Sequence, residues 1–103
     1  MPEYLIRYRV TPSKQPDDPK ALYEATKVAM AGADELTKAG IFKHNWGSGV
    51  GQGVAIAVFP SLEEAYKLGN SFWPMMTMEI QELMPWDKVK EIVLSQQKKA
   101  AEQ

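Results

Sequence analysis

The spacing of hydrophobic residues along the chain predicts four β-strands. In Tyr4–Val10 and in Met76–Leu83, hydrophobic and polar residues alternate with a period of two, which is typical of a strand with one buried face. Two further strands are expected at Ile41–Trp46 and Gly53–Phe59. Pro60 ends the second of these because proline has no N–H to donate to a neighbouring strand.

A glycine-rich segment separates the second and third predicted strands. A phosphate-binding loop would need a strand before it and a helix after it, whereas this segment has a strand on each side. The segment therefore predicts a β-hairpin turn in which glycine supplies positive φ. Its glycines are Gly47, Gly49, Gly51 and Gly53.

Capping signals predict three helices. The pair Asp18–Pro19 supplies an N-cap oxygen and then a proline at the first helical position, so a helix is expected from there to its C-terminal cap at Gly40. Ser61 and Glu64 match a capping box that starts a second helix. A third helix is expected from about Trp86, with a tail that frays from about residue 97.

This order of elements predicts one α+β domain over residues 1–103. The first six elements match the ferredoxin-like split β-α-β arrangement (βαββαβ), and the last adds an extra C-terminal helix. The arrangement implies a four-stranded antiparallel sheet in which the first strand lies between the third and the fourth. Both crossover helices are then expected on one face of the sheet.

Alternation along the strands assigns each side chain to one of the two sheet faces. The helix-covered face is expected to hold Tyr4, Ile6, Tyr8, Phe42, His44, Trp46, Val54, Ile56, Val58, Met76, Met78 and Ile80. The opposite face is expected to hold Leu5, Arg7, Arg9, Lys43, Asn45, Ala55, Ala57, Phe59, Thr77, Glu79 and Gln81.

The apolar members of the second set would form a strip that a single chain leaves in water. A second copy of the sheet would cover this strip, so a homodimer is expected in which Arg7 or Arg9 pairs with Glu79 across the central strands. The strip consists of Leu5, Ala55, Ala57 and Phe59.

The charged residues of this face have two interpretations: an ion-pair ladder that fixes register and dimer geometry, or a charged channel or anion site inside the dimer. They are Arg7, Arg9, Lys43 and Glu79.

Composition narrows the function classes. A net charge of −1 argues against nucleic acid and membrane surfaces as partners, since both need a concentrated basic surface. The chain has no cysteine and one histidine, which excludes disulfides, thiolate nucleophiles and a histidine metal cluster within one chain. No cofactor is expected. The N-terminal run is too short and too charged for a signal peptide, so a cytoplasmic location is expected.

Three segments carry a resemblance to a known superfamily. They are the hairpin with its following strand, GSGVGQGVAIAVF, then FWP at Phe72–Pro74, and MPWDKV after the fourth strand. On these segments the chain resembles the dimeric α/β-barrel superfamily, and within it a small uncharacterised branch. The resemblance implies a homodimer in which two sheets close into one barrel.

Better-known members of that superfamily include cofactor-independent monooxygenases, haem-degrading monooxygenases and muconolactone isomerases. They place small aromatic or hydrophobic ligands between the sheet and the helices. The asparagine, tryptophan and histidine of the haem-degrading members come from separate elements. Here His44, Asn45 and Trp46 are consecutive, so neighbours point to opposite faces and that set is not carried over.

The candidate site residues are those that could line such a pocket. His44 is the catalytic candidate, because it is the one side chain suited to proton transfer near neutral pH. The ligand-binding candidates are aromatic or thioether side chains, and each of them also has a structural interpretation as part of an ordinary core. They are Tyr4, Tyr8, Trp46, Trp73 and Met78.

Two hypotheses for function follow. In the first, a homodimer binds a small hydrophobic or aromatic molecule between sheet and helices, with cofactor-independent monooxygenase or isomerase-like chemistry as its enzymatic form. In the second, the chain is a non-catalytic dimeric assembly or sensor module. The shortage of residues suited to catalysis favours the second, and the resemblance favours the first.

Overall fold

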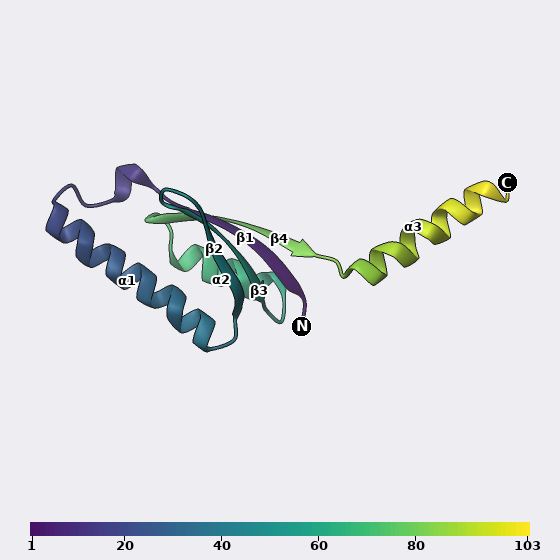
Figure 1. Cartoon of the computed structure of the whole chain (residues 1–103), viewed down its shortest axis with the longest axis horizontal. Coiled ribbons are helices and arrows are strands. Elements are labelled where there is room, and N and C mark those ends of the chain that lie inside the picture. The colour runs from purple at the N-terminus through teal and green to yellow at the C-terminus, as the bar shows by residue number, and fades with distance from the viewer.

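The computed structural model describes residues 1–103 as four strands and three α-helices (Figure 1). The strands are β1 (Glu3–Val10), β2 (Phe42–Gly49), β3 (Gln52–Val58) and β4 (Met76–Leu83). The helices are α1 (Pro19–Lys38), α2 (Leu62–Ser71) and α3 (Trp86–Ala101), with a short 3₁₀ turn at Pro12–Lys14. All four strands join in one antiparallel sheet in the order β2-β3-β1-β4. The α+β class and the central position of β1 are confirmed, and the arrangement is compatible with a ferredoxin-like fold.

Both ends of α1 form as the capping residues predict. The carboxylate of Asp18 accepts a hydrogen bond from the backbone N–H of Ala21 at 3.0 Å. At the other end Gly40 takes a positive φ of 78°. The backbone N–H of Ile41 then donates to the carbonyl of Leu36 at 3.0 Å, which is the hydrogen-bond pattern of a Schellman cap.

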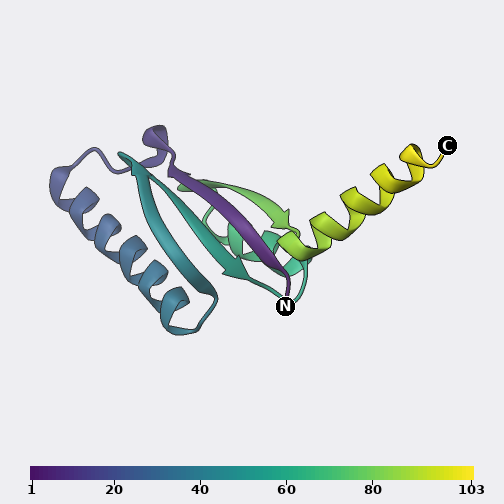
Figure 2. The same cartoon turned by 45° about the vertical axis from the view of Figure 1, so that its right-hand side comes forward.

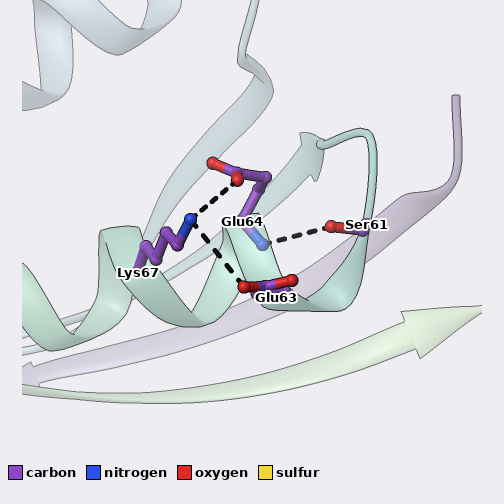
Figure 3. A network of polar contacts seen from close by, with 4 residues as sticks. All are labelled: Ser61, Glu63, Glu64 and Lys67. Carbon is purple, nitrogen blue, oxygen red and sulfur yellow. Dashed lines mark hydrogen bonds and ion pairs between the residues drawn. The ribbon is translucent and has the colours of Figure 1, made fainter.

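The N-terminus of α2 forms half of the predicted capping box. The hydroxyl of Ser61 accepts from the backbone N–H of Glu64 at 3.3 Å (Figure 3). The Glu64 carboxylate does not return to Ser61 but pairs with Lys67 Nζ at 3.1 Å, and Glu63 lies 3.8 Å from the same amine. These side chains are solvent-exposed, so the pairs add little stability.

The hairpin between β2 and β3 is confirmed, but its turn is narrower than the glycine-rich segment suggests. β2 continues to Gly49, and the turn is made by Val50 and Gly51. Only Gly51 of the four glycines has a positive φ, at 68°. Gly53 serves a different purpose, since a Cβ placed there would overlap the ring of Tyr8.

The hydrophobic core lies between the sheet and α2. Its largest fully buried side chains are Tyr4 and Ile6 on β1, and the Tyr4 ring packs edge-on against Phe59 with centroids 5.9 Å apart. The core is small for a chain of this length. It consists of Tyr4, Ile6, Phe42, Ala55, Ala57, Phe59 and Ala65.

The predicted faces of β3 are wrong. Tyr4 pairs directly with Ala57, and Ile6 with Ala55, and residues directly opposite in a sheet share a face. The alanines and Phe59 are therefore in the core, whereas Val54, Ile56 and Val58 lie half-buried on the other face. β3 is apolar on both faces, so alternation does not distinguish them. The small alanines belong to the same buried cluster as Ala65 of α2.

The predicted positions of His44 and Trp46 are wrong for another reason. A register shift interrupts the pairing of β2 between Phe42, opposite Ala57, and His44, opposite Ile56. This β-bulge adds one residue and exchanges the faces of everything after it. Asn45 then lies on the helix-covered face, and His44 and Trp46 lie on the opposite one.

The chain is extended for its length. α2 lies against one face of the sheet and α1 beside β2, whereas α3 projects away from everything else (Figures 1 and 2). Where a frayed tail was expected from about residue 97, α3 stays helical to Ala101. The radius of gyration is 18.1 Å, against about 13 Å for a compact domain of 100 residues.

The same shape leaves much surface exposed. The chain exposes 7764 Å², whereas a compact monomer of 11.6 kDa exposes about 5,800 Å². The three apolar side chains Trp86, Val93 and Leu94 on α3 are 70%, 42% and 63% exposed. One chain alone therefore buries less apolar surface than a domain of its size normally does.

Candidate functional site

The face of the sheet opposite the core is named the open face here. Strand register orders its side chains in rows that cross β2, β3, β1 and β4. One row runs from His44 through Ile56 and Leu5 to Gln81. The next runs from Trp46 through Val54 and Arg7 to Glu79, and beside it Gln52, Arg9 and Thr77 form a third at the hairpin end. The residues of β1 and β4 in these rows lie on the face predicted for them.

The candidate site residues do not come together in one place. Tyr4, Tyr8 and Met78 lie on the helix-covered face, with Tyr8 directly opposite Met78. His44 and Trp46 lie on the open face, on the other side of the sheet. A single pocket between sheet and helices therefore cannot contain all of them.

Tyr4 is enclosed by the core. Its side chain is 1% exposed and packs on Phe59. Burial raises the pKa of the Tyr4 phenol above its usual value, and the negative charge of Glu82 on the paired strand raises it further. These contacts account for Tyr4 as a core residue.

Tyr8 lies at the rim of the core and has a polar partner. Its hydroxyl donates a hydrogen bond to the side-chain oxygen of Asn45, which the bulge in β2 brings to this face. Tyr8 also covers Gly53, the residue directly opposite it on β3. The pair ties the edge strand β2 to β1 across β3.

Trp73 stands apart from the other candidates. It lies in the turn between α2 and β4, directly before the cis peptide bond to Pro74, and its side chain is 63% exposed. It lines neither of the two depressions on the sheet that are described below.

His44 and Trp46 form an aromatic platform on β2. Their rings stack with centroids 5.3 Å apart and planes inclined by 12°. Trp46 is 55% exposed, so a broad ring face remains open to solvent. Such a platform can hold a flat ring by stacking.

Two depressions lie on the open face, and neither His44 nor Trp46 lines them. The larger depression reaches Val54, which pairs directly with Trp46. Its volume is about 380 Å³, and it is lined by Arg7, Arg9, Gln52, Val54 and Thr77 among others. The other, of about 220 Å³, shares Arg7 and Glu79 with it. The hollowed part of the sheet is therefore polar and cationic towards the hairpin end.

The arginines are the residues that the candidate list missed. Alternation predicts their face correctly, and an anion site inside the dimer is one interpretation of their charge. An ion-pair ladder is the favoured interpretation, so the arginines are absent from the candidate site residues. A composition signal could have found them, since Arg7 and Arg9 are the only arginines in the chain.

An ion pair marks the opposite end of the open face. Lys43 Nζ lies 2.8 Å from the Glu3 carboxylate, and this hydrogen bond and its charge lower the pKa of Glu3. No three histidine, aspartate or glutamate side chains come close enough together to hold a metal ion. The open face thus offers an aromatic platform, two arginines and neutral hydrogen-bonding groups.

Comparison with known proteins assigns no family. No protein-family model matches the chain, and no curated protein matches it either. Among its helices, none combines the length and the apolar character needed to cross a membrane.

Proposed function

We propose that this protein binds a small aromatic molecule on the open face of its sheet and that it does so as a homodimer. The observation that carries the proposal is the stacked pair of His44 and Trp46, next to Val54, which lines the larger depression of that face. A stacked platform attracts aromatic rings, and half-exposed Val54 supplies an apolar floor next to it.

The surface that one chain leaves exposed supports the proposed homodimer. The excess over a compact monomer is roughly 1,900 Å², and stable homodimers bury comparable areas per subunit. The apolar part of the open face can supply such an interface. It consists of Leu5, Ile56, Val58 and Leu83, all half-buried.

In this dimer two open faces would pack about 10 Å apart, as sheets commonly do, and would form the barrel that the resemblance implies. The apolar part would meet its counterpart. The polar part, at the hairpin end, would then form the mouth of the barrel, where a ligand can enter. This places the ligand on the opposite face from the one expected from the sequence.

The enzymatic form of the proposal assigns His44 as the base. Cofactor-independent oxygenation or isomerisation begins when a base removes a proton from the bound molecule. His44 is suited to this role because its ring is part of the platform that would hold the substrate.

A second candidate function is a non-catalytic assembly module, which the exposure of α3 favours. Trp86, Val89 and Val93 share one side of this helix, and the helix projects away from the rest of the chain (Figure 2). An amphipathic helix with a free apolar side can dock on a partner surface.

The proposal is tested with 2-naphthol, a neutral aromatic probe, by titration calorimetry and thermal shift. We expect saturable binding, a raised melting temperature, and a loss of affinity of about threefold to tenfold in Trp46→Leu. Trp73→Leu is the matched control, because it removes the same side chain from the turn between α2 and β4, outside the strands of the sheet.

Two results would contradict the proposal. One is the absence of saturable binding to the wild type, and the other is an equal loss of affinity in Trp73→Leu. Oxygen uptake or isomerisation of a bound probe that disappears in His44→Ala would establish the enzymatic form. Binding without turnover of any probe would leave a binding protein.

A further inference from the structure

Arginine is used at one place only in this chain. Arg7 and Arg9 are its two arginines, and they lie two residues apart on β1, so both point to the open face. Every other cation of the chain is a lysine, apart from the N-terminal amine. We propose that Arg7 and Arg9 bind the carboxylate of the ligand, so that the molecule bound on the open face is an aromatic acid.

Neither arginine is engaged with an acid in the structure. All seven ion pairs of the chain are made by lysines. Glu79 is directly opposite Arg7 on β4, yet the two make no ion pair. Arg9 has neutral neighbours on both sides, Gln52 on β3 and Thr77 on β4. Two cations and one carboxylate leave this end of the open face with a net positive charge.

The chemistry of the site fits a carboxylate. An arginine presents its N–H groups as a planar fork that matches the two oxygens of a carboxylate, whereas lysine offers a point charge. The same depression contains the hydroxyls of Thr77 and Ser48 and the amide of Gln52. These groups can donate further hydrogen bonds to an oxyanion.

The spacing fits an aromatic acid. Trp46 pairs with Val54, and Val54 pairs with Arg7, so the platform and the arginine are two strands apart. Adjacent strands lie about 4.8 Å apart, which separates the two backbones by about 10 Å. A ring stacked beside Trp46 can extend its carboxylate over Val54 to Arg7. The inference rests on the proposed function for the position of the ring, whereas the arginine site can be tested by itself.

The experiment compares 2-naphthoate with neutral 2-naphthylmethanol by titration calorimetry on the full chain. Charge-assisted hydrogen bonds predict that the wild type binds the acid about tenfold or more tightly than the alcohol. The double variant Arg7→Gln/Arg9→Gln should bind both probes equally. The control Lys14→Gln/Lys20→Gln removes the same charge from two exposed lysines outside the sheet and should keep the preference.

Further variants test whether a lost preference for the acid is caused by misfolding or by the loss of positive charge alone. The single variant Arg9→Gln should lose part of the preference with an unchanged melting temperature. Arg7→Lys/Arg9→Lys keeps the charge but loses the fork, so its preference should fall below that of the wild type. Inorganic phosphate is the third probe, because it is an oxyanion like the carboxylate of 2-naphthoate but has no aromatic ring.

The possible outcomes distinguish a failure of this inference from a failure of the proposed function. Equal binding of acid and alcohol to the wild type, with loss of both in Trp46→Leu, would overturn the inference and leave the proposed function standing. Phosphate that binds as tightly as 2-naphthoate would overturn the assignment of an aromatic acid. If neither naphthalene probe binds, both proposals fail.

Discussion

At the scale of a single residue, the strand pairing and the burial of Tyr4 determine the pH at which its phenol ionises. Tyr4 pairs with Ala57 on one side and Glu82 on the other, and its ring is enclosed in the core against Phe59. A phenol in that position cannot ionise without bringing a negative charge into an apolar environment, close to another negative charge. The raised pKa of Tyr4 expresses this cost.

A consequence is that the fold should weaken in alkali. The unfolded chain ionises Tyr4 near its ordinary value of 10.0, whereas the folded chain holds the proton to higher pH. The stability contributed by the protonated phenol is complete below the unfolded pKa and is lost as pH rises through the folded pKa. Urea unfolding measured between about pH 9 and pH 11 should show a falling free energy of unfolding.

Two tyrosine variants test whether Tyr4 causes this loss of stability in alkali. In Tyr4→Phe the decline with pH should become shallower, since no buried phenol remains to ionise. In Tyr66→Phe, which alters a tyrosine that is 62% exposed, the decline should match the wild type. A decline that is the same in all three proteins would show that Tyr4 is not its source.

At the scale of elements, the close approach of β1 and β3 depends on a glycine. Gly53 lies directly opposite Tyr8, and a Cβ at that position would overlap the Tyr8 ring, which is also hydrogen-bonded to Asn45. Gly53→Ala should therefore lower the free energy of unfolding by about 1–3 kcal/mol, as overpacking commonly does.

Gly47→Ala is the matched control in the same hairpin. No atom lies within 4 Å of a Cβ built at Gly47, and its φ is not positive. Its effect on the free energy of unfolding should stay within about 0.5 kcal/mol. Chemical denaturation of both variants measures the difference, and equal stabilities would show that the approach of Tyr8 to Gly53 is not tight.

The same elements show how far the sequence predicts this fold. The helix ends at Asp18 and Gly40 carry local signals and form as predicted. α2 also begins after Ser61 as predicted, although only half of its capping box forms. The order of the strands follows from the order of elements. These features depend on contacts within a few residues or on general rules of connection.

The wrong predictions concern residues of β2 and β3 whose sheet face depends on how the strands pair. Local sequence does not reveal the bulge before His44, because the bulge exists only relative to β3. Likewise β3 is apolar on both sides, and its partner on β1 determines that Ala55 is inside. These two features moved His44 and Trp46 to the open face and divided the predicted site. Arg7 and Arg9 were placed correctly because β1 alternates clearly.

At the scale of the whole molecule, the chain exposes more surface than a compact monomer of its mass. Its open face is apolar at the centre, α3 projects without a covered side, and the core contains only seven buried hydrophobic residues. The proposed ligand site depends on this assembly, since a second sheet would close the depressions that one chain leaves shallow.

The most direct test is the mass of the full chain in solution by sedimentation equilibrium at micromolar concentration. We expect a homodimer, with twice the chain mass of 11.6 kDa. Ile56→Glu, at the centre of the open face, should reduce that mass to one chain, whereas Val28→Glu, on the exposed side of α1, should not. A wild-type mass of one chain, or a dimer that Ile56→Glu leaves intact, would contradict assembly through the open face.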